Sequence, residues 1–60
     1  MDLSEKELSV IQDLLYEEEL LVKKFQMLAE HSQDETIKQQ MLDISQKHQG
    51  HFNSIYSYVK

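Results

Sequence analysis

Apolar residues recur along the chain at alternating spacings of four and three, which is the pattern of one face of an α-helix. The pattern continues on both sides of a polar stretch near residues 30–34. It predicts two helices, one over about residues 5–30 and one over about residues 33–58. Each helix would be roughly 39 Å long at about 1.5 Å per residue. Two helices of equal length joined by a short turn predict an antiparallel hairpin, with residues 1–60 as a single all-α unit.

Both predicted helices begin with a capping signal. Ser4 is followed three residues later by Glu7, which forms a capping box: the Ser4 hydroxyl accepts from the Glu7 N–H, and the Glu7 carboxylate accepts from the Ser4 N–H. The same signature recurs at Ser32 and Glu35 and predicts that Ser32 caps the second helix. The chain has no proline and only one glycine, so the helical pattern is almost free of helix breakers.

The residues selected by the four–three spacing would form the contact, here called the seam, between the two helices. In the first helix the seam comprises Ser4, Leu8, Ile11, Leu15, Glu18, Val22, Phe25 and Ala29, flanked by Leu14, Leu21 and Leu28. In the second helix it comprises Ile37, Met41, Ile44, His48, His51, Ile55 and Tyr58, flanked by Phe52 and Val59. Such a wide stripe suits a bundle better than a two-stranded coiled coil. It therefore predicts that two hairpins pair as a homodimeric four-helix bundle, with higher assembly left open.

Size and composition narrow the classes of function. With 60 residues and no cysteine, the chain must be stabilised by a second copy, by a metal with nitrogen and oxygen ligands, or by both. A formal net charge of −5 disfavours nucleic acid as a partner. The longest apolar run, Leu20-Leu21-Val22, is far too short to span a membrane, and the first residues do not resemble a signal peptide. A cytoplasmic protein without a membrane partner is expected.

Three polar residues interrupt the seam and are the candidate site. Glu18 lies among leucines and valine on the first helix, and His48 and His51 lie three residues apart on one face of the second. If the turn is centred near residues 32–33, Glu18 lies level with about residues 46–48 in an antiparallel hairpin. All three side chains are therefore expected in one layer.

Two interpretations of this layer stay open. Imidazole nitrogens and a carboxylate are suitable ligands for iron, zinc, manganese or copper, and two hairpins would offer up to six such side chains. Alternatively, Glu18 and a protonated histidine form a buried polar pair that only fixes the register of the helices. No arrangement for hydrolytic catalysis is found beyond this layer, so no catalytic residue is predicted and enzymatic activity is left open.

The pattern resembles the ferritin-like superfamily, and within it the small two-helix proteins of the rubrerythrin and spore coat protein F group. Glu18 matches the glutamate that projects inward from one helix. The segment His48-Gln49-Gly50-His51 stands where those proteins have Glu-x-x-His, with His51 matching its histidine. The resemblance implies a metal-binding bundle active in metal sequestration or modest redox chemistry, or a structural coat-like protein associated with spores. Because His48 replaces the glutamate that bridges two metals, it favours a single metal, a zinc-like site or a bundle that has lost its metal.

Overall fold

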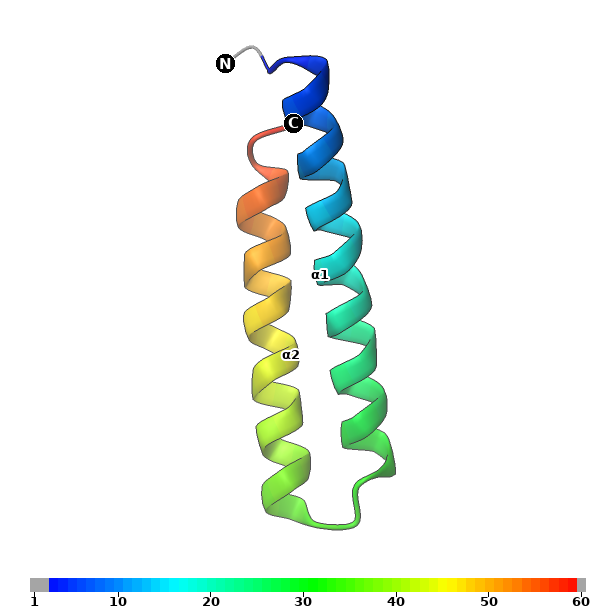
Figure 1. The fold of residues 1–60 in the computed structure, drawn as a ribbon. Helices are drawn as coiled ribbons and strands as arrows, with labels where there is room; N and C mark the ends of the chain where they lie inside the picture. The colour runs from blue at the N-terminus through cyan, green and yellow to red at the C-terminus, as the bar shows by residue number, and fades with distance from the viewer. Residues whose placement is uncertain (1–2, 60) are drawn as a thin grey trace.

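The computed structural model describes residues 3–59 and is a hairpin of two antiparallel helices (Figure 1). Helix α1 spans Glu5–His31 and α2 spans Glu35–Tyr56. The two helices lie side by side, with the short turn at one end and the start of α1 beside the end of α2 at the other. The predicted all-α hairpin is confirmed, and residues 3–59 contain no strand. Neither described helix is long and apolar enough to cross a lipid bilayer.

The start of α1 is the predicted capping box. Ser4 Oγ accepts from the Glu7 N–H at 3.0 Å, and Glu7 Oε1 accepts from the Ser4 N–H at 3.0 Å. The backbone N–H of Ser4, and after it the Ser4 side chain, hold the pKa of Glu7 below its usual value, because hydrogen bonds to a carboxylate favour its charged form. The box therefore gives two backbone N–H groups a hydrogen-bond acceptor and places a negative charge at the positive end of the helix dipole.

The start of α2 differs from the prediction. Asp34, not Ser32, is the N-cap: its Oδ1 accepts from the Ile37 N–H at 3.0 Å, and the helix begins at Glu35. The Ser32 hydroxyl acts within the turn instead, accepting from the Asp34 N–H at 3.3 Å and donating to the Asp34 carbonyl at 3.1 Å. The predicted capping box at Ser32 and Glu35 is thus wrong. Asp is as good a capping residue as Ser, and it adds a charge that the helix dipole favours.

Small side chains occupy the best-buried positions of the seam. Val22, Ala29 and Ser45 are 8%, 2% and 4% exposed, whereas no large side chain among the described residues is fully buried. Several of the larger seam residues are half-buried, among them Ile11, Leu15, Phe25, Met41, Ile44, Phe52 and Ile55. The hairpin alone therefore removes only part of its apolar surface from water.

Helix α2 is rotated relative to the predicted seam. Ile37 and Tyr58, predicted to lie in the seam, are 47% and 60% exposed, and His51 is exposed as well. Ser45, which was not predicted to be buried, faces α1 instead. The distance between two packed helices depends on the side chains at their contact, and a serine at that point allows a close approach. The rotation leaves one flank of the predicted α2 stripe in water.

The N-terminal cap gives a first prediction. Ser4→Ala is expected to lower the free energy of unfolding by about 1 kcal/mol, because it removes the acceptor for a backbone N–H that has no partner within the helix. The matched control is Ser9→Ala, at an exposed position inside α1, where alanine is expected to be neutral or slightly stabilising. Urea denaturation followed by circular dichroism measures both. Equal effects of the two substitutions would contradict the role of Ser4.

Glu7 gives a prediction for acid solution. A carboxyl whose pKa is lowered by folding stabilises the protein above its unfolded-state pKa, and the stabilisation is lost as the pH falls through the folded-state pKa. Glu7→Gln keeps an acceptor for the Ser4 N–H but cannot titrate. The wild type is therefore expected to have a higher thermal midpoint than Glu7→Gln at neutral pH, and the difference is expected to vanish in acid. A difference that stays constant from pH 7 to pH 2 would show that the charge of Glu7 does not contribute.

Candidate metal centre

Glu18 from α1 and His48 and His51 from α2 come together between the two helices. One ligand atom from each residue can be chosen so that all three atoms lie within 4.8 Å of one another. The Glu18 carboxylate is bifurcated between the two rings, with Oε1 at 2.6 Å from His48 Nδ1 and Oε2 at 3.5 Å from His51 Nδ1. The structure thus brings together the three polar residues that the sequence pattern placed in one layer, at the predicted register.

The contact between Glu18 and His48 is a short hydrogen bond. An ionised carboxylate can only accept, so with Glu18 ionised the Nδ1–H of His48 is the donor of this hydrogen bond and Glu18 Oε1 is the acceptor. The side chains of His48 and Glu18 are only 21% and 18% exposed, so the neighbouring helices shield the bond from most of the solvent. At 2.6 Å the contact is shorter than the roughly 2.7–2.9 Å of hydrogen bonds between a nitrogen donor and a carboxylate that are strengthened by charge. The carboxylate in the seam is therefore already partnered within the hairpin.

Two aromatic contacts hold the ring of His48. Phe25 stacks on it with ring centroids 5.7 Å apart and planes inclined by 11°, and His51 meets it edge-on at 5.5 Å and 87°. The sequence placed Phe25 in the seam but not in the site. Its position seven residues after Glu18, two turns further along the same seam, is the signal that could have indicated this contact. Phe25 thereby fixes the plane of the imidazole that faces Glu18.

His51 forms the open side of the site. Its side chain is 60% exposed, in contrast to the half-buried Glu18 and His48. The remaining histidine, His31, lies at the exposed C-terminal end of α1 and is not part of the group. The site is consequently closed on the side of Phe25 and accessible from solvent on the side of His51.

The donor set suits a divalent transition metal. Two imidazoles and a carboxylate are ligands of zinc, iron and manganese. Zinc ligands at about 2.1 Å in tetrahedral geometry lie roughly 3.4 Å from one another, which agrees with the 3.5 Å between Glu18 and His51. The 2.6 Å between Glu18 Oε1 and His48 Nδ1 is shorter than this, so a metal bound between these two atoms would replace the proton of the hydrogen bond and widen the contact by roughly 0.8 Å. Metal and proton therefore compete for the same place.

Comparison of the chain with known protein families, with curated proteins and with solved structures finds no match. The resemblance to the ferritin-like superfamily therefore stays a prediction that depends on the pattern around Glu18, His48 and His51.

The geometry predicts unequal coupling of the two histidines to Glu18. In a double-mutant cycle, Glu18→Ala and His48→Ala are expected to be coupled by about 1 kcal/mol, because each alone breaks a short, shielded hydrogen bond. The cycle of Glu18→Ala with His51→Ala serves as the matched comparison. Its coupling is expected to be smaller, since His51 is mostly exposed and its ring nitrogen lies 3.5 Å from the carboxylate. Urea denaturation in the presence of a chelator measures both cycles, and equal coupling energies would contradict the geometry.

Proposed function

We propose that this protein is a small ferritin-like metal-binding protein that holds one divalent zinc, iron or manganese ion with Glu18, His48 and His51. The observation that carries the proposal is the convergence of three ligand atoms within 4.8 Å from residues on two different helices. Three protein ligands leave at least one coordination position for water or for a further ligand. Such a site suits metal sequestration or modest redox chemistry.

The surroundings of the site support this proposal. A carboxylate set among apolar residues is costly to bury unless a cation or hydrogen-bond donors offset the cost. The formal net charge of −5 also favours a cation over an anion as the ligand. In addition, Phe25 and His51 contact the ring of His48, so this ring has little side-chain freedom left to lose when a metal binds.

A second candidate is a structural or coat-like interaction protein in which this layer binds no metal. The observation that favours it is the 2.6 Å hydrogen bond, since Glu18 has a partner without any ion. A buried polar pair of this kind can fix the register of packed helices. The two candidates differ in one property: only a metal-binding protein is stabilised by a divalent ion and loses that stabilisation in a chelator.

The test is a titration of the untagged chain with Zn²⁺, read by isothermal calorimetry and by the shift of the thermal midpoint. Saturable binding and a rise of the midpoint that a chelator reverses are expected for the wild type. His48→Ala and His51→Ala are each expected to weaken zinc binding by at least ~10-fold, because each removes a ligand. The ion should also displace a proton, so the heat of binding should depend on the ionisation enthalpy of the buffer.

The matched control is His31→Ala, which removes the histidine that lies outside the group. Its zinc affinity is expected to equal that of the wild type. Zinc binding that is lost equally in His31→Ala and His51→Ala would indicate unspecific surface binding and would overturn the assignment. A wild type whose thermal midpoint is indifferent to both zinc and chelator would favour the structural candidate.

A further inference from the structure

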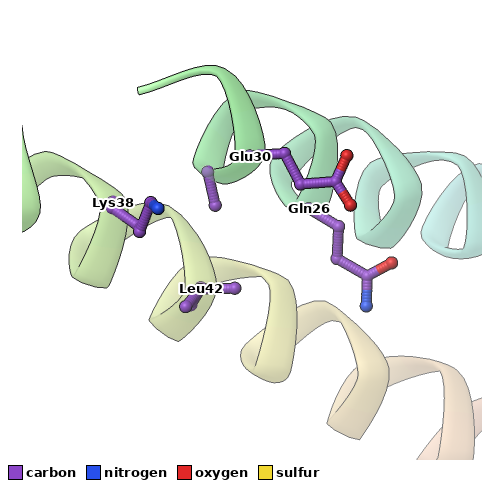
Figure 2. Close-up of a pocket in the computed structure, with 5 residues that line it drawn as sticks. Gln26, Glu30, Lys38 and Leu42 are labelled. Atoms are coloured by element: carbon purple, nitrogen blue, oxygen red, sulfur yellow. The ribbon is translucent and has the colours of Figure 1, made fainter. Parts of the chain in front are cut away.

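A shallow pocket near the turn shows which flanks of the two helices share a side of the hairpin. It is lined by Gln26, Ala29 and Glu30 of α1 and by Lys38 and Leu42 of α2 (Figure 2). Successive residues on a regular helix are about 100° apart around its axis. The residues that line this one pocket therefore fix which flank of each helix faces this side along its whole length. Along this side of the hairpin, polar and charged residues are interspersed with the apolar ones.

The opposite flanks of α1 and α2 therefore share the other side of the hairpin, and this side is largely apolar. We call it the apolar face and define it by Val10, Leu14, Leu21, Leu28, Ile37, Ile44 and Tyr58. Five of its residues are large and exposed: Val10 by 53%, Leu14 by 42%, Leu28 by 53%, Ile37 by 47% and Tyr58 by 60%. His51 belongs to the same row, in which residues 37, 44 and 51 of α2 and residue 58, just beyond its end, follow one another at intervals of seven.

The broad side of the hairpin, which carries the apolar face, is large enough for a protein interface. The hairpin measures 46 × 14 × 11 Å between its outermost Cα atoms. Its broad side thus presents roughly 640 Å² before side chains are counted, close to the ~800 Å² per partner of a standard interface. Monomeric proteins rarely expose contiguous apolar patches larger than a few hundred Å², so exposed apolar side chains along both helices point to a partner that covers them. The face extends along both helices, so a partner of similar length and shape would cover it best.

We propose that a second copy of this chain packs its apolar face against this one and forms a two-fold pair of hairpins. A two-fold pair brings the same face of both copies together, so an apolar face along the full hairpin is complementary to itself. Charges of both signs border it, with Glu17 and Lys24 on either side of Leu21 in α1. Such a border allows an acid of one copy to approach a base of the other.

The same pairing would complete the metal centre, a consequence that rests on the proposed function. His51, the open side of the site, lies in the row of the apolar face and would be covered by the second copy. Glu18 is the middle residue of α1, which spans Glu5–His31. Two hairpins that overlap fully therefore bring their sites to the same level, whether they run parallel or antiparallel. The second copy would then supply further Glu and His ligands to a site that one chain leaves incomplete.

The test compares two neighbouring residues of α1. Leu28 lies in the apolar face and Met27 on the back of the helix, and they are 53% and 54% exposed in the hairpin. In chelator-containing buffer, sedimentation equilibrium of the wild type is expected to give twice the chain mass of 7.2 kDa. Leu28→Glu is expected to raise the dissociation constant of the dimer at least ~100-fold, because two-fold symmetry places two carboxylates in the apolar interface. Met27→Glu is expected to leave it unchanged.

A second measurement covers the case in which Leu28→Glu also loses its helices. The thermal midpoint of a dimer rises with protein concentration, whereas that of a monomer does not. A midpoint that rises with concentration in the wild type and in Met27→Glu, together with loss of mass or of helix in Leu28→Glu, supports the pairing. A wild type that is monomeric at every concentration, or variants that are equally affected, overturns it.

Adding Zn²⁺ to the same samples separates this inference from the proposed function. A monomer that binds zinc through Glu18, His48 and His51 would overturn the pairing and leave the metal site standing. A dimer that assembles in chelator through Leu28 and binds no zinc would support the pairing and overturn the metal site.

Discussion

Two packed helices share one seam, and each can turn only a limited stripe of its surface toward the other. In this protein the best-buried positions of that stripe hold Val22, Ala29 and Ser45, all of them small, while the larger apolar side chains stay half-buried or exposed. The hairpin therefore cannot form a closed core by itself. The exposed apolar face and the one-sided shielding of the polar site both follow from this limit.

The periodicity of the chain was enough to predict the two helices, the hairpin and the layer that joins Glu18 to the histidines, because these depend on helix geometry and turn length alone. The cap of α2 was not predicted correctly, because Ser32 and Asp34 compete within three residues and the geometry of the turn decides between them. The rotation of α2 about its own axis could not be predicted, because its apolar stripe is wider than the contact between two helices. Such a stripe can pack in several rotational positions. The stacking of Phe25 on His48 depends on side-chain geometry that spacing does not determine.

The two candidate functions use the same carboxylate and imidazole atoms. They differ in whether a metal ion or a proton lies between these atoms. The Nδ1 of His48 lies 2.6 Å from Glu18 Oε1, and a proton in this contact would occupy the place that a metal between the same two atoms would need. A metal gains two imidazoles and a carboxylate but must widen the shortest contact of the site, whereas the proton keeps the hydrogen bond as it is. Whether the site holds a metal thus depends on the balance between these two states.

The distance along the chain between Glu18 and His48 has a consequence for how the hairpin opens. The two residues are 30 positions apart, and their contact joins the two helices partway along their length. In a chain without cysteine, such a contact acts as a reversible cross-link that closes a long loop containing the turn. The half of the hairpin that includes the turn lies inside this loop, and the half that includes the two chain ends lies outside it. The open end is therefore expected to fray more readily than the loop that this contact closes, so the short protein would have two regions of different local stability.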